Sequence, residues 1–259
     1  MTTGLQVRIA QSREELFRIF RLRYEVYVEQ QQKPLPNADS TLRIVKDRLD
    51  EVATNFYVCD QDDQILACGR STIGTWPEVC EGPFSIPQLE GFRREDFYYI
   101  SKVMINPRFR SPLAIPSLFL EMYKDGRTKL CPFGIANCTP KLVPIYSRLG
   151  WRRFGPEFFD PHSGPQVPIL LVAPGVDYLQ KTRSILIQAA YDFPNDPFYL
   201  SWFERVFLGQ EAVLTVCEEV AVQQLVPTNS RESSISGPQP KTILAGGPLN
   251  SPSEAGQEW

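Results

Sequence analysis

The amino-acid sequence predicts a mixed α/β fold in which helices flank a central, mostly antiparallel sheet. Short alternating or continuous apolar runs indicate strands, and two of them, separated by a tight polar turn, indicate a β-hairpin. Longer runs with apolar residues three and four positions apart indicate helices. In chain order, the predicted elements are a strand, a helix, three strands, a helix, a strand, a helix and a strand.

The N-terminal elements have clear sequence boundaries. Apolar residues alternate over 5–10, which predicts a strand. Ser12 and Glu15 match a capping box, so a helix is expected to start there and to run to about Glu29. A polar, proline-containing loop follows, and the hairpin strands are expected over 55–61 and 65–74.

The later elements alternate between strand and helix until the pattern becomes entirely helical. Strands are expected over 97–107, 133–139 and 167–174, with helices over 116–130 and 140–150 and further helical sequence from 177. The final residues are rich in Pro, Ser and Gly and almost lack large apolar side chains, which is typical of disorder. The predicted organisation is a domain over 1–184, a C-terminal helical extension over 185–226 and a disordered tail over 227–259.

Composition excludes several function classes. The chain has 259 residues, a hydrophobic fraction of 42% and a net charge of −3, which gives no general case for nucleic acid or an anionic membrane as its main partner. No apolar run reaches the roughly 18–20 residues that span a bilayer, and the first residues lack the apolar core of a signal peptide. The prediction is a cytoplasmic protein without a transmembrane segment.

Six cysteines and a single histidine limit the available chemistry. No two cysteines form a CxxC pair and His162 lies near none of them, so neither a metal site nor a disulfide framework is expected. The segment FFDPHSGP around His162 indicates a surface turn. Without a Ser-His-Asp or Cys-His arrangement, any acyl transfer is expected to proceed by direct attack rather than through an acyl-enzyme.

The first predicted helix carries a charge in an unexpected place. In FRLRYEVYVEQ, over 20–30, Arg23 lies beside an apolar face at helical spacing. It is either a solvated charge or a residue held near the core. The acidic pair Asp47 and Asp50 follows in KDRLDE, and Gly69-Arg70 follows in the second hairpin strand, so an Arg, a D-x-x-D and a Gly-Arg occur in that order.

Two further patterns lie in the second half of the chain. One is YYISKVMINPRFR at 98–110, and the other is VPIYSRLGWRRFG at 143–155, in which Tyr146 precedes Gly150-Trp151. With the ordered set above, they resemble the GNAT acyltransferase superfamily over roughly 5–180. Within it, the chain is most similar to N-acyl amino acid synthases and to their relatives, the acyl-homoserine-lactone synthases.

The resemblance implies a GNAT fold whose fourth main strand splays from its neighbour and binds the pantetheine arm of an acyl donor. The residues implied for this strand and its oxyanion-binding N–H groups are Ser101, Lys102, Val103 and Met104. The autoinducer synthases carry a Glu and an Arg beside this strand, where Tyr99 and Lys102 stand here. Tyr146 is implied to protonate the departing thiolate; alternatively, it only packs against the sheet.

The phosphate-binding segment departs from the GNAT pattern. RFRSPLAIPSLF contains Arg108 and Arg110 but no glycine, and its two prolines lack N–H donors. A tight grip on the pyrophosphate of coenzyme A is therefore not expected. A donor carried on an acyl carrier protein fits the missing glycines better, and a non-catalytic relative would fit them too.

The carboxylates of the segment KDRLDE are candidates for handling the amine. Asp47, Asp50 and Glu51 could hold it or relay its proton through water; alternatively, they belong to a solvated loop. Arg23 and Arg70 could pair with these carboxylates or clamp a substrate carboxylate. Arg23 is expected to point across the cleft mouth toward them.

Two larger sets concern the donor. Five arginines are expected around the cofactor cleft, where they would steer an acidic acyl carrier protein or else form ordinary surface: Arg108, Arg110, Arg148, Arg152 and Arg153. Four apolar residues of one loop are expected to line an acyl pocket or else to be plain core: Trp76, Phe84, Ile86 and Leu89. Cys68 is expected to be a small buried hydrophobe.

These expectations combine into an N-acyltransferase that joins a fatty acyl group, carried by acyl carrier protein or coenzyme A, to the amine of an amino acid or related small molecule. No tightly bound cofactor is expected. The alternatives are a conventional acetyl-CoA-dependent N-acetyltransferase and a catalytically silent module that binds acyl groups or a partner protein. The sequence leaves open the amine, the acyl length and the oligomeric state.

Overall fold

The computed structural model describes residues 4–74, 91–109 and 111–208. These residues belong to a compact unit that spans Met1–Thr215, whereas the second unit, Val216–Trp259, lies outside the described residues. The predicted tail over 227–259 falls in the second unit. The predicted division at 184 stays a prediction.

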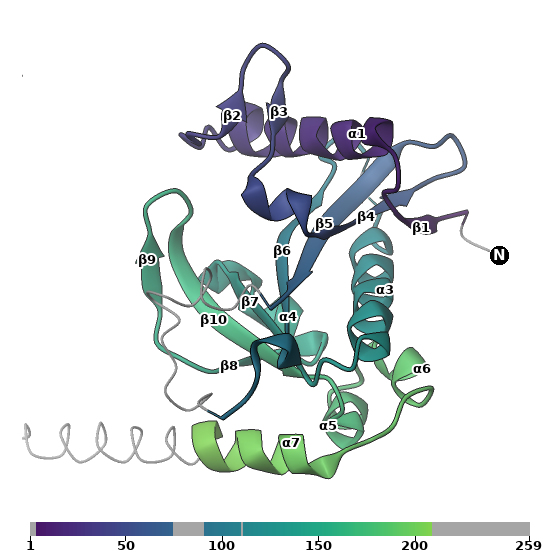
Figure 1. Cartoon of the computed structure of the whole chain (residues 1–259), viewed down its shortest axis with the longest axis vertical. Helices are drawn as coiled ribbons and strands as arrows, with labels where there is room; N and C mark the ends of the chain where they lie inside the picture. The colour runs from purple at the N-terminus through teal and green to yellow at the C-terminus, as the bar shows by residue number, and fades with distance from the viewer. Residues whose placement is uncertain (1–3, 75–90, 110, 209–259) are drawn as a thin grey trace, which may run out of the picture. The chain divides into compact units, whose positions relative to one another are not determined.

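One large sheet organises the described residues, in the order β1-β4-β5-β6-β7-β10-β8, with β9 paired to β10 (Figure 1). Its neighbours are antiparallel except for β6 and β7, so the predicted mixed, mostly antiparallel sheet is confirmed. The strands are β1 (Gln6–Ile9), β4 (Thr54–Cys59), β5 (Ile65–Ile73), β6 (Phe97–Ile105), β7 (Phe133–Cys138), β8 (Arg152–Arg153), β9 (Phe158–Asp160) and β10 (Gly164–Val172).

Helices bury both faces of the central strands. Alternate residues of β4 point to opposite sides, so Phe56 and Val58 pack with α3 (Ala114–Thr128), while Tyr57 and Cys59 pack with α1 (Arg13–Tyr24). This double burial explains why β4 reads as a nearly continuous apolar run. The remaining helices are α4 (Val143–Arg148), α5 (Val176–Lys181), α6 (Ile187–Ala190) and α7 (Pro197–Phe203).

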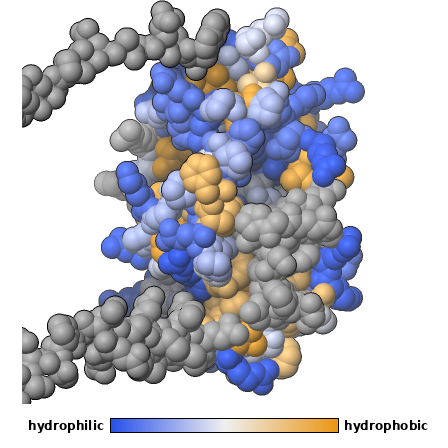
Figure 2. All heavy atoms as spheres, turned by 90° about the vertical axis from the view of Figure 1, so that its left-hand side faces the viewer, coloured by the Kyte–Doolittle hydropathy of each residue, from blue (hydrophilic) through white to orange (hydrophobic). Residues whose placement is uncertain are grey.

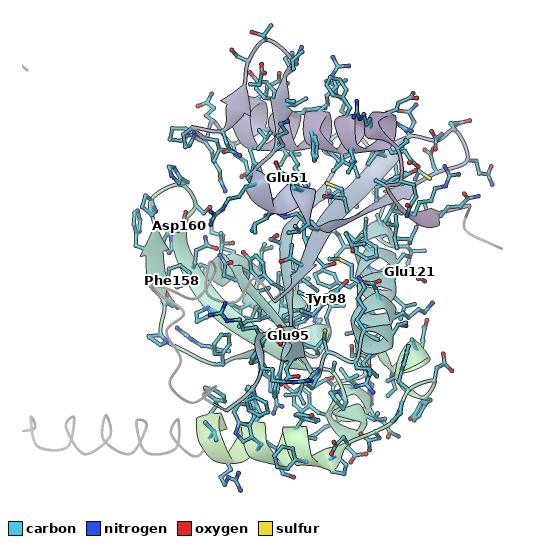
Figure 3. The ribbon with its side chains drawn as sticks, in the orientation of Figure 1. Glu51, Glu95, Tyr98, Glu121, Phe158 and Asp160 are labelled. Carbon is cyan, nitrogen blue, oxygen red and sulfur yellow. The ribbon has the colours of Figure 1, made fainter. Side chains whose placement is uncertain are left out.

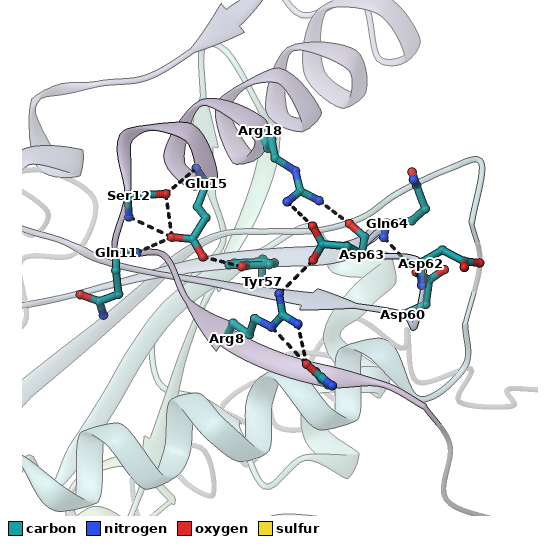
Figure 4. Close-up of polar contacts among 11 residues, drawn as sticks. Arg8, Gln11, Ser12, Glu15, Arg18, Tyr57, Asp60, Asp62, Asp63 and Gln64 are labelled. Atoms are coloured by element: carbon teal, nitrogen blue, oxygen red, sulfur yellow. Dashed lines mark hydrogen bonds and ion pairs between the residues drawn. The ribbon is translucent and has the colours of Figure 1, made fainter.

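The predicted capping box at the start of α1 is confirmed (Figure 4). Ser12 Oγ accepts a hydrogen bond from the Glu15 N–H at 3.1 Å, and Glu15 Oε2 accepts one from the Ser12 N–H at 2.9 Å. The Tyr57 hydroxyl donates to the other carboxylate oxygen of Glu15 at 2.7 Å. That bond and the backbone donors lower the pKa of Glu15 to about 2, so the helix start is fastened to β4 by an ionised carboxylate.

The end of the first helix differs from the prediction. α1 ends at Tyr24 and continues as a wider π-helical segment, η1 (Glu25–Gln30), in which the Gln31 N–H donates to the carbonyl of Val26. A π-helical turn inserts residues relative to the α-helical spacing, and such turns are frequent at functional sites. The expected helical extent to about Glu29 is therefore right, but its regular periodicity stops five residues earlier than the pattern implied.

A bulge interrupts the pairing of β5 with β6. Cys68 pairs with Met104 and Arg70 pairs with Ser101, so two residues of β6 face Gly69. One of them, Lys102, has a φ of 54°, which is uncommon for a residue with a side chain. Gly69 suits the close approach of α3, because an added Cβ would lie 3.1 Å from the sulfur of Met122.

Four short strands have no counterpart in the sequence prediction. They are β2 (Ala38–Asp39), which pairs with β3 (Ile44–Val45), and β8 and β9, which pair with β10. Strands of two or three residues cannot display an alternating pattern, so periodicity could not reveal them.

The predicted helical extension is described only as far as residue 208. Leu186 and Ala189 are buried in the hydrophobic core around α3, and Trp202 and Phe203 of α7 pack with Phe133 of β7. The segment closes with η6 (Glu204–Leu208). No helix within the described ranges is both long and apolar enough to cross a bilayer.

Candidate active site

A cleft of about 1050 Å³ opens where β6 and β7 separate. The two strands pair in parallel only over Phe97–Tyr99 and Phe133–Ile135. Beyond this seam the cleft is lined by Ile100–Val103 of β6 and by 137–139 from the end of β7. The predicted splaying of this strand pair is therefore present, and it leaves one backbone edge of β6 facing the cleft.

The remaining walls come from segments far apart in the sequence. Tyr27 lies within η1 and Gln31 directly follows it, and Asp47 lies just before the 3₁₀ turn η2 (Arg48–Glu51). The hairpin of β9 and β10 supplies Phe158, Asp160 and Gln166. Figure 3 shows Phe158 and Asp160 on β9, with Glu51 on the segment across from it.

Arg70 is the centre of a charged network at the edge of the cleft. Its Nη1 lies 3.1 Å from Asp50 Oδ1 and donates to Asp47 Oδ1, and its Nε donates to Ser101 Oγ at 3.0 Å. Lys102 Nζ lies 3.6 Å from Asp47 Oδ2. The ordered set of charges found in the sequence is thus one continuous cluster in space.

Arg23 forms the buried end of this network. Its side chain is 0% exposed, with Nη1 at 2.8 Å from Asp50 Oδ1 and Nη2 at 2.6 Å from Asn55 Oδ1. Its guanidinium carbon lies 5.1 Å from the centre of the Phe20 ring. The expected approach to Asp50 is present, but the expected place at the cleft mouth is wrong, because Arg23 lies behind Asp50 and does not line the cleft.

The three candidate carboxylates differ in exposure. The Asp50 side chain is 4% exposed and enclosed by the two arginines, whereas that of Asp47 is 28% exposed and lines the cleft. Glu51 is exposed and is not among the cleft residues. Of the three, Asp47 alone is placed to touch a ligand in the cleft.

The protonation of the cleft charges follows from their neighbours. Partial burial acts to raise the pKa of Asp47, but the hydrogen bond and charge of Arg70, with the charge of Lys102, outweigh it and hold the pKa below its usual value. Burial lowers the pKa of Lys102, and the nearby arginines add to this effect against the attraction of Asp47. Asp47 is therefore ionised at neutral pH.

Residues 18–173 match the family of the N-acyl amino acid synthase FeeM. The chain belongs to this family. The matched region includes the charged network, the seam between β6 and β7, and the whole of β10. Membership makes the chain an N-acyltransferase.

Solved structures agree with this fold. FeeM from uncultured soil microbes is 16% identical, with a TM-score of 0.55 over 71% of this chain and 97% of that chain. MesI, a CoA-dependent acyl-homoserine lactone synthase, is 19% identical, with a TM-score of 0.54 over 72% and 95%. LasI, an acyl-homoserine lactone synthase, is 19% identical, with a TM-score of 0.51 over 66% and 91%. At these identities the likeness establishes the GNAT-like fold alone. No curated protein sequence matches the chain.

The residues of the splayed strand divide between two environments. Ser101, Lys102 and Val103 line the cleft, as the family resemblance implies. Met104 does not; it is buried with α1 on the other face of the sheet. The expected lining of the cleft is therefore present for Ser101, Lys102 and Val103, whereas the Met104 side chain lies on the opposite face.

The packing expected of Tyr146 is confirmed, and its role in protonating the thiolate stays a prediction. Its ring packs edge-on against Phe119 and Trp151, with centroid distances of 5.5 and 6.0 Å, and it also lines the cleft. Burial raises its pKa, so the hydroxyl keeps its proton at neutral pH. Tyr99, which stands where the autoinducer synthases carry a charged residue, lines the same cleft.

Of the five predicted donor-binding arginines, the four that the structure describes do not converge. Arg152 is buried between the rings of Tyr178 and Phe203, and with Arg153 it lines a separate hollow bordered by α5 and α7. Arg108 is exposed and its Nε lies 2.8 Å from Glu25 Oε1, while Arg148 is exposed on α4. The expectation of one basic cluster around the cleft is wrong for Arg152 and Arg153, because the short strand β8 turns them toward the helices.

Several predicted residues cannot be placed. Arg110 and the four acyl-pocket candidates lie outside the described residues: Trp76, Phe84, Ile86 and Leu89. Two other predictions are confirmed, because Cys68 is fully buried and His162 is exposed in the turn between β9 and β10. Within the described ranges, no three His, Cys, Asp or Glu side chains gather as metal ligands.

Sequence analysis missed other polar residues of the cleft. They include Lys33, Asn137, Lys141, Asp160 and Gln166. They stand in loops or at strand ends, where neither spacing nor a motif distinguishes them. Figure 2 shows the side of the molecule on which β2 and β9 lie, where hydrophilic side chains dominate the upper part and hydrophobic groups are exposed between them.

Proposed function

We propose that this N-acyltransferase moves a fatty acyl group from a thioester, on acyl carrier protein or coenzyme A, to the amine of an amino acid or related small amine by direct attack. The observation that supports this most is the position of ionised Asp47 beside the free edge of β6, in a cleft shared with Tyr146. An amine, a thioester carbonyl and a leaving thiolate would each meet a suitable group there.

The donor would lie along β6. Beyond Tyr99 this strand has no partner in β7, so its backbone groups near Ser101 and Val103 are available to the amides of a pantetheine arm. A backbone N–H in the same stretch would stabilise the tetrahedral oxyanion, as preorganised donors do in acyl transfer.

The acceptor would enter on the side of Asp47. An ionised carboxylate attracts the ammonium form of the acceptor and can relay a proton from that ammonium group to water. The acceptor is then the neutral amine that attack requires. The amine nitrogen then bonds to the thioester carbon, and the C–S bond breaks as the tetrahedral intermediate collapses. Tyr146 would give its proton to the departing thiolate and regain one from the attacking nitrogen through water.

The acyl chain would extend into the core next to the cleft. Ile100 lines both the cleft and a small apolar cavity between the sheet and α3. That cavity is lined in part by Phe119, Met122, Trp151 and Leu171, which are buried hydrophobic side chains. The cavity holds only about 20 Å³, so the apolar side chains around it would have to move apart to admit the chain, and each methylene buried there would then gain roughly 0.8 kcal/mol.

An assay with both donor types tests the proposal. Purified protein is incubated with acyl carrier protein and coenzyme A thioesters of several chain lengths and with the common amino acids, and products are identified by mass spectrometry. Acylated amino acids that require the protein support the proposal. D47N should remove them, whereas E51Q, which changes an exposed neighbour, should not. The absence of any such product with every donor and acceptor would refute it.

A preference between donors is a second result of the same assay. The segment that starts α3 has no glycine, and Pro112 and Pro116 lack N–H donors. These features favour acyl carrier protein, on which the phosphopantetheine arm has no pyrophosphate to be held. Faster turnover with the coenzyme A thioester than with acyl carrier protein would contradict this part of the proposal.

A further inference from the structure

Two lysines of the cleft lie against one aromatic ring. The ammonium nitrogen of Lys33 is 4.9 Å from the centre of the Tyr27 ring, and that of Lys102 is 5.3 Å from it. All three residues line the cleft. Two cations that share one ring leave a local excess of positive charge in a space that is open to ligands.

The backbone brings both lysines to this ring by uncommon conformations. Gln32 has a φ of 51°, which turns the chain so that the Lys33 N–H donates to the Tyr27 carbonyl at 2.9 Å. Lys102 has a φ of 54° in the bulge of β6. Each left-handed residue costs about 1 kcal/mol or more, so the surrounding packing holds these positions against a local penalty.

Lys33 has no carboxylate partner among the described residues, whereas Lys102 lies 3.6 Å from Asp47. The charge of Asp160 acts to raise the pKa of Lys33, but no ion pair joins the two side chains, and Asp160 Oδ1 accepts the N–H groups of His162 at 2.9 Å and Ser163 at 2.6 Å. Burial lowers the pKa of Lys33 more than Asp160 raises it. An anion from solution would supply the charge that the protein does not.

We propose that Lys33 binds the anionic group of the acceptor, so that the enzyme selects amines that carry a carboxylate. The assignment rests on the function proposed above. An amino acid has a cation and an anion at fixed separation, and the cleft offers Asp47 for the first and Lys33, which contacts the same Tyr27 ring as Lys102, for the second. Lys33 is then a specificity-determining residue, while the amine chemistry stays with the network around Asp47.

Calorimetric titration tests this contact without turnover. The probes are N-dodecanoylglycine and N-dodecanoylglycinamide, which differ in the carboxylate alone. The wild type should bind the acid about tenfold more tightly than the amide, which corresponds to about 1.4 kcal/mol. K33M should lose that preference, and K124M, which removes a lysine paired with Glu121 on α3, should keep it. Equal binding of both probes by the wild type, or a preference kept by K33M, overturns the proposal.

Turnover provides the second measurement. Each amino acid that serves as a substrate is compared with its own carboxamide in the wild type and in K33M. The KM of the acid should rise about tenfold in K33M, while kcat/KM of the amide changes by less than about twofold. An equal loss for acid and amide would make Lys33 a structural residue and overturn the proposal. If the titration succeeds but no amine is acylated, the anion site stands and the proposed function fails.

Discussion

Arg70 joins the buried and the exposed halves of the charged network, because its Nη1 lies 3.1 Å from Asp50 Oδ1 and also donates to Asp47 Oδ1. Asp50 is enclosed with Arg23, and Asp47 faces the cleft. One guanidinium therefore links a group that stabilises the fold to a group that is available to substrate. Substitutions at the two ends of this chain of charges should have different consequences.

Replacing Arg23 by Met should reduce stability more than chemistry. Removing one partner of a buried ion pair leaves the other charge uncompensated, so the free energy of unfolding should fall by about 3 kcal/mol. Chemical denaturation measures this loss. The matched control is R43M, whose pair with Glu29 is exposed and should contribute less than about 1 kcal/mol. An R23M protein of wild-type stability that makes no product would instead place Arg23 in direct contact with substrate.

Replacing Asp47 by Asn should reduce chemistry more than stability. If the carboxylate holds the amine, kcat/KM should fall by about a hundredfold or more. The E51Q variant gives the baseline for a lost acidic charge in the same turn. Similar kcat/KM values for D47N and E51Q would show that Asp47 has no special part in the reaction.

The stability that Asp47 contributes should depend on pH in a defined direction. The folded-state pKa of Asp47 is below the ordinary value of about 3.9, so its contribution is complete above that value. It is lost as the pH falls through the lower, folded-state pKa. The difference in unfolding free energy between wild type and D47N should be constant near neutral pH and shrink below about pH 4. A difference that grows with acidity would contradict the lowered pKa.

Two substitutions at Lys102 distinguish the effect of its backbone conformation from the effect of its ammonium group. K102G removes the penalty of the left-handed conformation that K102A retains, so K102G should be more stable than K102A by about 1 kcal/mol. Thermal or chemical unfolding measures the difference. Both variants lack the ammonium group, and equal catalytic losses would assign the effect to the side chain. Recovery of activity in K102G alone would assign it to the backbone.

Replacing Tyr146 by Phe tests the hydroxyl without removing the ring. The edge-on contacts with Phe119 and Trp151 remain, so the unfolding free energy should change by less than about 1 kcal/mol. If the hydroxyl protonates the thiolate, kcat should fall by about a hundredfold with a natural donor. A donor with a more acidic thiol leaving group should restore part of the rate. An unchanged kcat would leave Tyr146 with its packing role alone.

The regular parts of the fold could be predicted from the sequence because helices and strands have periodic patterns of apolar residues. The capping box at Ser12, the hairpin of β4 and β5, and the order of strands and helices each have a local signature of spacing or composition. The short strand β8 has none, and its position decides that Arg152 packs between Tyr178 and Phe203 instead of facing the cleft. A tertiary contact of this kind is not encoded in neighbouring residues.

The part of the candidate site that follows an ordered motif of charged residues could be predicted from the sequence. The part of the cleft that is lined by loops could not. Arg23, Asp50 and Arg70 are linked as the ordered motif suggests. Whether each of these side chains is buried depends on the elements that pack over it in the folded chain. The spacing of residues in the sequence does not determine that packing. Lys33 reaches the cleft through the π-helical turn and the left-handed Gln32, two backbone features without a sequence signature.

The parallel seam between β6 and β7 has a mechanical consequence. It consists of three residue pairs, from Phe97 with Phe133 to Tyr99 with Ile135, and it joins the leaf β1-β4-β5-β6 to the leaf β7-β10-β8. Donor and acceptor bound beyond the seam would bridge two leaves whose strands pair with each other only along this short edge. Occupancy of the cleft should then slow hydrogen exchange in both leaves at once.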